Sequence, residues 1–191
     1  MKHKFLKSVA GLAMFASAFA FAQPPYPTKP ITMIVPFAAG GPTDTVARLV
    51  AQSMGNTLKQ TVLVENVGGA GGTIGAARVA KSAPDGYTLF LHHIGQSTAP
   101  SLYRKLSYNA IDDFEPIGLI TDVPMTFIAR GDFPAKDLKE LLAYVKANKT
   151  KVTYANAGIG SASHLCGMLF MTAIDTELTT VPYKGCLLYT S

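Results

Sequence analysis

Cysteine and net positive charge are both scarce in this sequence. Only Cys166 and Cys186 occur among 191 residues. Two cysteines allow one disulfide, although the apolar helical surroundings of Cys166 favour a buried free thiol. Of 17 lysines and arginines, three lie at positions 2, 4 and 7, which leaves 14 basic residues against 12 acidic residues from residue 23 onward. This balance leaves no basic patch with interleaved aromatic residues, so we expect no nucleic-acid partner.

Nucleotide-binding and hydrolase motifs are missing as well. No Walker A pattern occurs, and the glycine stretches at 69–74 and 158–163 both lack the last glycine of the dinucleotide fingerprint. No Gly-x-Ser-x-Gly elbow is present. His92 and His93 are adjacent, so on an extended segment they point to opposite sides and cannot share a metal ion. We therefore expect no catalytic residue, no cofactor and no metal ion.

Beyond the N-terminus, no apolar stretch is long enough to span a bilayer. The apolar run at 9–21 is itself short for a span. Lysines precede it, and Ala20-Phe21-Ala22, a small-x-small cleavage pattern, ends it. These features predict a signal peptide at 1–22, cleaved after Ala22; an N-terminal membrane anchor is the alternative. Since no cysteine lies near the cleavage point, we do not expect a lipoprotein.

The most informative stretch runs from Ile31 to Arg48. The apolar, β-branched run at 31–35 predicts a buried strand, and a small glycine-rich loop follows it. Thr43 or Asp44 is expected to cap a helix that extends to about residue 58. Free backbone N–H groups at such a helix start, together with the helix dipole, favour a small anion. The same pattern also describes a plain strand-to-helix turn without a ligand.

The rest of the chain alternates between the two kinds of element. Strands are expected at 31–37, 60–65, 87–91, 151–155 and 178–182, with two more candidates at 117–120 and 125–129. Helices are expected at 43–58, 73–81, 99–105, 135–148 and 164–174. This order predicts an α/β fold with parallel sheets and helices on both faces. We place a boundary after residue 124, which gives a first lobe at 23–124 and an incomplete second lobe at 125–185.

A second strand, small-residue loop and helix occur around residues 156–163 and match the arrangement near residue 40. Ligands of open α/β sheets lie beyond the carboxyl ends of the strands. Two lobes with facing loops would hold an anion between them and close by a hinge motion. Asp44 is then either a helix cap or a ligand-selecting group, and Arg48 is a surface or ion-pair residue. His92 and His93 are ordinary loop residues, or one of them touches the ligand.

Eight segments, in order along residues 25–185, carry a further signal: 26–31, 35–44, 64–75, 84–89, 102–103, 113–114, 158–165 and 181–185. In composition and order they resemble the Bug-type receptors of tripartite tricarboxylate transporters. The resemblance implies a two-lobed periplasmic solute-binding protein, type II-like and of the Venus flytrap kind, without enzymatic activity. It also implies a small carboxylate ligand and delivery to a membrane permease. The stretch at 93–100 looks closest to members that bind amino-dicarboxylates such as aspartate.

The loop pattern and the resemblance together predict a set of ligand-binding residues. They are Phe37, Ala38, Ala39, Gly40, Gly41, Asp44, His93, Ser97, Thr98, Asn156, Gly158, Gly160, Ser161, Ser163 and His164. We expect a monomeric receptor. A ligand-sensing receptor lobe for signalling is one alternative. A secreted hydrolase that uses Ser161 or Ser163 with His164 is another.

The end of the chain departs from the family pattern, which continues beyond Gly185. Residues 186–191 can be encoded by TGT CTC TTA TAC ACA TCT, which looks like a transposon-end sequencing adapter. We therefore predict that residues 186–191 are a non-native tail. The resemblance implies that the C-terminal part of the second lobe is missing.

Overall fold

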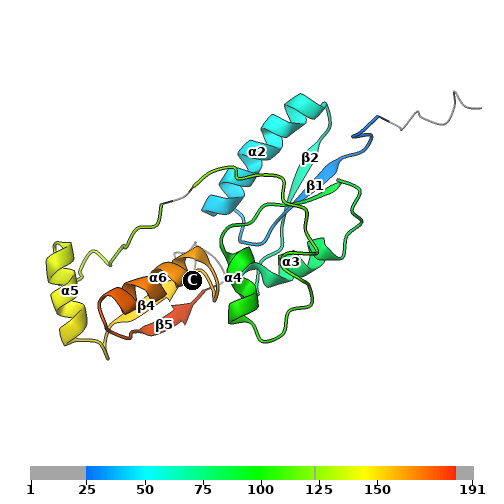
Figure 1. The fold of residues 1–191 in the computed structure, drawn as a ribbon. Coiled ribbons are helices and arrows are strands. Elements are labelled where there is room, and N and C mark those ends of the chain that lie inside the picture. Colours follow the sequence, from blue (N-terminus) through cyan, green and yellow to red (C-terminus); the bar gives the residue numbers. More distant parts are fainter. Residues whose placement is uncertain (1–24, 123, 184–191) are drawn as a thin grey trace, which may run out of the picture.

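The computed structural model describes residues 25–122 and 124–183, which form two successive α/β units (Figure 1). The first unit contains β1 (Ile31–Val35), α2 (Pro42–Leu58), β2 (Val62–Asn66), the 3-10 helix η1 (Ala70–Gly72), α3 (Thr73–Ala80), β3 (Thr88–Phe90) and α4 (Gly95–Leu102). The second unit contains α5 (Leu138–Ala147), β4 (Thr153–Asn156), α6 (Ala162–Ala173) and β5 (Thr179–Pro182). The predicted signal peptide and the predicted non-native tail lie outside the described residues, as does Cys186.

Both sheets are parallel, which confirms the predicted α/β class. The first sheet has the order β2-β1-β3, and the second sheet pairs β4 with β5. Because β1 is central, its side chains face packed elements on both sides, and four of its five residues are buried. Parallel sheets are usually covered on both faces, and such strands are then rich in Val and Ile, as β1 is.

The core of the first unit is an apolar cluster between the sheet and α2. Met33, Val35, Ala47 and Leu91 are buried, and six partly buried apolar residues of α2, β2 and β3 pack against them. Full burial of a side chain such as Val35 contributes roughly 1.5–3 kcal/mol. The small side chains of Ala47 and Ala51 let α2 lie close to the sheet. This core fixes the carboxyl end of β1, where the first predicted ligand loop begins.

The helix predicted at 99–105 begins earlier, at Gly95, and ends at Leu102. The polar composition of 92–98 is typical of a loop, which is why the start was misplaced. The hydroxyl groups of Ser97 and Thr98 donate to the carbonyl of Ile94, at 2.9 Å and 3.3 Å. These bonds give polar side chains a partner inside the first helical turn.

The two strands predicted at 117–120 and 125–129 are wrong for the described residues. This segment links the first unit to the second without regular structure (Figure 1). Its apolar side chains are exposed, for example Ile117 at 85% and Ile128 at 87%. An apolar, β-branched run becomes a strand only when a neighbouring strand pairs with it, and sequence composition does not supply that partner. Within residues 25–122 and 124–183, no helix has both the length and the apolar character to cross a membrane.

Candidate functional site

The first predicted loop, after β1, leads into α2 through Gly41. Gly41 is the N-cap residue, with extended backbone angles of φ −76° and ψ 170°, and Pro42 occupies the first helical turn. The prediction that Thr43 or Asp44 caps this helix is therefore wrong. Proline suits the first turn because its fixed φ matches the helix and its missing N–H has no intrahelical acceptor there. Only Gly40, with φ +79°, needs the left-handed conformation in this loop.

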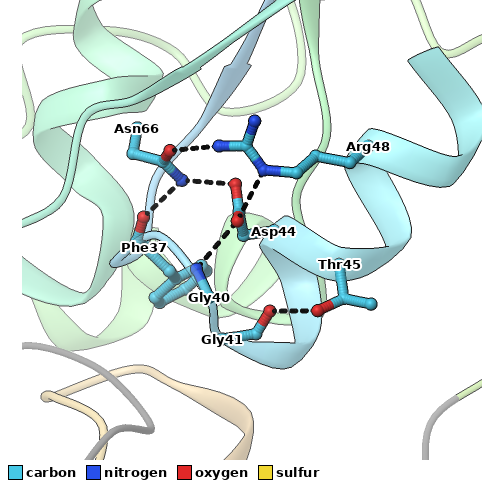
Figure 2. Close-up of polar contacts among 7 residues, drawn as sticks. All are labelled: Phe37, Gly40, Gly41, Asp44, Thr45, Arg48 and Asn66. Carbon is cyan, nitrogen blue, oxygen red and sulfur yellow. Dashed lines mark hydrogen bonds and ion pairs between the residues drawn. The ribbon is translucent and has the colours of Figure 1, made fainter. Parts of the chain in front are cut away.

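Asp44 lies one turn further along and ties the loop together (Figure 2). Its side chain is 2% exposed. One carboxylate oxygen accepts from the backbone N–H of Gly40 at 2.8 Å and from Nε of Arg48 at 2.9 Å. The other oxygen accepts from Nδ2 of Asn66 at 2.9 Å, and the same amide donates to the carbonyl of Phe37 at 3.0 Å. We call these residues the Asp44 network.

The Asp44 network is ionic. The hydrogen bond from the Arg48 guanidinium, with weaker help from Gly40 and Asn66, lowers the pKa of Asp44 to about 2. The side chain of Asp44 is therefore a carboxylate at neutral pH, and both of its oxygens already have partners inside the protein. The predicted ion-pair role of Arg48 is confirmed. The network holds the loop backbone in place, because it joins the loop to the first turn of α2 and the end of β2.

The second predicted loop, after β4, is held by neutral groups, which we call the Ser161 network. Ser161 is 1% exposed and is the N-cap of α6, with Oγ accepting from the backbone N–H of His164 at 3.2 Å. Oγ of Ser163 accepts from the N–H of Ala157 at 2.9 Å and lies 3.0 Å from Oγ of Ser161. Oδ1 of Asn156 accepts from the N–H of Gly158 at 2.9 Å. These side chains thus stabilise the loop backbone from within.

His164 does not form a catalytic pair with a serine hydroxyl in this arrangement. Its Nδ1 accepts from the backbone N–H of Gly160 at 3.3 Å. The hydrogen bond between Ser161 and His164 uses the backbone N–H of His164, so it involves no imidazole nitrogen. A serine nucleophile needs an imidazole nitrogen within hydrogen-bond reach of its Oγ.

The two adjacent histidines pack on the same phenyl ring, so the prediction that they point to opposite sides is wrong. β3 ends at Phe90, and beyond it the rings of His92 and His93 lie 5.5 Å and 4.5 Å from the ring of Phe37. Burial lowers the pKa of His92 to about 3 and that of His93 to about 4, so both are neutral at pH 7. Among residues 25–122 and 124–183, no group of three His, Cys, Asp or Glu side chains is placed to hold a metal ion.

A pocket of about 310 Å³ lies between the two units. Its lining comes from segments that follow four strands, together with one tyrosine after α4: Pro36, Phe37, Gly69, Ala70, Gly71, Gly72, Tyr103, Ala157, Gly158, Ile159, Pro182 and Tyr183. The strands are β1, β2, β4 and β5, and the pocket lies beyond their carboxyl ends, where open α/β sheets bind ligands. Among the residues that the structure describes, no Lys, Arg, His, Asp or Glu side chain is in the lining, which offers a ligand backbone groups, apolar groups and tyrosine hydroxyls.

Two of the predicted ligand-binding residues, Phe37 and Gly158, line this pocket. Most of the others do not line it. They belong to the Asp44 network, the Ser161 network or the pair of histidines that pack on Phe37, and these groups contact the segments that do line it. The hydroxyls of Ser97 and Thr98 donate within α4. Ligand contact by any of the predicted residues remains a prediction.

Sequence reasoning missed the glycine loop at 69–72, Tyr103 and Tyr183. The loop follows a strand and precedes a helix, the same pattern that selected the other two loops, so that pattern was sufficient to find it. Gly69, Gly71 and Gly72 all have positive φ, which explains why glycines recur there. No sequence pattern indicates Tyr103, since its place in the lining depends on how the two units meet.

A family model described as the tripartite tricarboxylate transporter family receptor matches residues 46–187. The chain belongs to this family. The Bug-type resemblance is confirmed, and the family comprises receptors, which does not support the hydrolase alternative. A protein of Agrobacterium vitis, described as a UPF0065 protein in the TAR-I ttuE-ttuC' intergenic region, is 58% identical over 166 residues. That match covers 87% of this chain and 48% of the relative.

Solved structures agree with the fold. The periplasmic binding protein BugD is 61% identical with a TM-score of 0.80, and the match covers 84% of this chain and 54% of BugD. MatC from Rhodopseudomonas palustris, solved with bound malate, is 44% identical with a TM-score of 0.78, with 84% and 55% covered. These likenesses confirm the predicted α/β fold of the periplasmic solute-binding proteins. The chain spans about half the length of the relatives it matches.

Proposed function

We propose that this receptor binds a small dicarboxylate in the pocket between its two units and delivers it to the permease of a tripartite tricarboxylate transporter, in the periplasm. The observation that carries the proposal is the pocket beyond the ends of four parallel strands, lined by glycine loops and, within residues 25–122 and 124–183, without a charged side chain. The malate bound to MatC, which is 44% identical, supports a dicarboxylate. Family membership supports the transport role.

Backbone N–H groups are the natural partners of a carboxylate in such a pocket. The loops at 69–72 and 157–159 lead into the starts of α3 and α6, where the positive end of the helix dipole lies and where the first N–H groups of a helix have no intrahelical acceptor. A hydrogen bond to a charged group is worth about 1.5–3 kcal/mol. The hydroxyls of Tyr103 and Tyr183 add polar groups to the lining. In such a pocket, the positive ends of the helix dipoles of α3 and α6 are the groups that stabilise the negative charge of the ligand.

The volume of the pocket suits a small ligand. About 310 Å³ lies at the low end of small-molecule pockets. We extend the proposal to an amino-dicarboxylate such as aspartate, since the resemblance of residues 93–100 points to such members. The ammonium group of aspartate needs carbonyl or hydroxyl acceptors, and the lining loops contain both. A signalling receptor lobe would recognise the same ligands, and a neighbouring sensor-kinase gene in place of a permease gene would favour it.

Titration calorimetry of the full-length receptor against mono-, di- and tricarboxylates tests the proposal. We expect one dicarboxylate, malate or aspartate among them, to bind with a dissociation constant in the micromolar range or below, about −8 kcal/mol or better. Succinate is the matched control: it has the same two carboxylates as malate and aspartate but lacks the hydroxyl or ammonium group, so it measures what that group contributes to the affinity. Binding of a neutral or cationic solute, with no response to any carboxylate, would contradict the proposal.

Export is tested separately. N-terminal sequencing of the protein from a periplasmic extract should begin at Gln23, one residue after the predicted cleavage point. Recovery of an uncleaved, membrane-bound chain would show that residues 1–22 are an anchor.

A further inference from the structure

Tyr103 connects the two units across the edge of the pocket. It follows α4 in the first unit, and its hydroxyl donates to the carbonyl of Ile159 in the second unit at 2.7 Å. The two residues are 56 positions apart in the chain. Both residues also line the pocket. This hydrogen bond therefore joins the two units at the site where a ligand would be enclosed.

Gly71 lies at the same place and allows the two backbones to touch. A Cβ at Gly71 would overlap the carbonyl oxygen of Ile159 and would come within 2.8 Å of the Tyr103 hydroxyl. Its φ of +63° is in the left-handed region that favours glycine. On the facing loop, a Cβ at Gly158 would lie 3.6 Å from Cα of Gly71. Close approach of the units thus depends on a bare backbone at Gly71.

We propose that Gly71, Tyr103 and Ile159 form a latch that holds the two units together over the pocket. The latch favours the closed arrangement even without ligand, and it slows escape of a bound ligand. Tyr103 acts as a positioning residue: its hydroxyl fixes the carbonyl of Ile159 and so fixes the loop at 157–159. Ligand retention by the latch rests on the proposed function, whereas its effect on the ligand-free receptor does not.

A hydrogen-bond deletion with a matched control tests the latch. Tyr103→Phe keeps the aromatic wall of the pocket and removes the bond to Ile159. Tyr26→Phe removes a bond of the same chemistry, from the Tyr26 hydroxyl to the carbonyl of Gly86 at 2.6 Å, inside the first unit. The readouts are the distance between labels on the two units in the ligand-free, full-length receptor, and the dissociation rate of bound malate or aspartate.

We expect Tyr103→Phe to shift the ligand-free receptor toward the open form by roughly 2- to 12-fold, the usual range for one hydrogen bond. The dissociation rate should rise by a similar factor. Tyr26→Phe should match the wild type in both measurements. A Tyr103→Phe receptor with wild-type label distances would overturn the latch. If the distances shift but no carboxylate binds to any variant, the latch stands and the proposed function fails.

A second pair of variants tests the backbone contact. Gly71→Ala places a methyl group where the loops meet, so small-angle scattering should show no contraction when ligand is added. Gly68→Ala is the control, because its nearest non-neighbouring atoms lie 3.8 Å from the added Cβ and its φ is not positive. It should contract as the wild type does. A folded Gly71→Ala receptor that contracts normally would overturn the latch, and if Gly71→Ala does not fold, Tyr103→Phe decides.

Discussion

The two loops that approach the pocket from β1 and β4 are held by different chemistry. The Asp44 network uses a buried carboxylate, a half-exposed guanidinium and an amide. The Ser161 network uses two hydroxyls, an amide and backbone groups, all of them uncharged. Both networks hold a strand-to-helix loop whose first residues line the pocket. Such a loop is therefore held by hydrogen bonds from side chains to its backbone, and these do not require a particular charge.

The largest effect of a single substitution is expected at Asp44. Asp44→Ala leaves the Gly40 N–H, the Asn66 amide and the Arg48 guanidinium without their acceptor. A hydrogen bond to a charged group is worth about 1.5–3 kcal/mol, so loss of the bonds to the buried Asp44 carboxylate should cost about 3 kcal/mol or more in the free energy of unfolding, measured by urea denaturation of the full-length receptor. The control is Asp132→Ala, which breaks an exposed pair with Arg130 and should cost less than about 1 kcal/mol. Equal losses would contradict the central role of the Asp44 network.

As the pH falls, the histidines that pack on Phe37 should lower the stability of the receptor at a higher pH than Asp44 does. The folded-state pKa values of His92 and His93 are depressed to about 3 and about 4, so below pH 6.5 the unfolded chain binds protons that the folded chain does not. Stability should fall by about 1.4 kcal/mol per pH unit for each histidine, from pH 6.5 down to about 4. Asp44 contributes fully above its unfolded pKa of 3.8 and loses its contribution as the pH falls through about 2.

The pH dependence is measured by urea denaturation at pH 7, 6, 5 and 4. A receptor with His92→Gln and His93→Gln should show a flatter profile over this range. An unchanged profile in the double variant would mean that other groups cause the acid sensitivity.

A substitution in the Ser161 network should lower the free energy of unfolding less than Asp44→Ala does. Ser161→Ala removes the N-cap of α6, which typically costs about 1 kcal/mol of stability. Ligand binding should weaken by roughly 10-fold, because the loop backbone is held less firmly. Thr172→Ala is a suitable control, since that hydroxyl donates to the carbonyl of Met168 within α6, away from the pocket. A loss that changes between low and high salt would contradict the neutral character of this network.

The smallest effect is expected at Arg48. Its side chain is 54% exposed, and Asp44 keeps the Gly40 N–H and the Asn66 amide when Arg48 is removed. Arg48→Ala should cost less than about 1 kcal/mol, and 1 M salt should reduce the difference further, since salt screens exposed pairs. Denaturation at two salt concentrations measures this. A loss as large as that of Asp44→Ala would mean that the guanidinium, and not the hydrogen bonds to Gly40 and Asn66, holds the loop.

Local pattern was sufficient to predict the elements whose signals are local. The apolar run at 31–35, the helix after it and the amphipathic helix at 138–147 all appear where periodicity placed them, within a few residues. The segment at 117–129 was mispredicted because a strand also needs a pairing partner. The start of α4 was misplaced because hydroxyl side chains satisfy carbonyls inside its first turn, which makes a helix look like a loop in sequence.

The pocket lies next to both loops that the sequence selected, although only two of the selected residues, Phe37 and Gly158, line it. Asp44, Ser161 and Ser163 were selected as polar residues near a ligand, but in the structure their polar atoms bond to the protein's own backbone. Tyr103 was missed because its role depends on the meeting of two units, which no local pattern encodes. Polar residues in a glycine-rich loop thus indicated where a pocket lies, and in the structure they hold the backbone around it.

A crystal structure of the full-length receptor with malate or aspartate tests the central claim most directly. The claim is that a carboxylate is held between the two units by backbone N–H groups and the hydroxyl of Tyr183, since the Tyr103 hydroxyl donates to Ile159. We expect a ligand carboxylate within hydrogen-bond distance of N–H groups from residues 69–71 and from Ile159, since the other N–H groups at 157–161 donate within the protein, with no lysine or arginine in contact. A ligand carboxylate paired with an arginine or lysine side chain, or bound outside this pocket, would contradict the account.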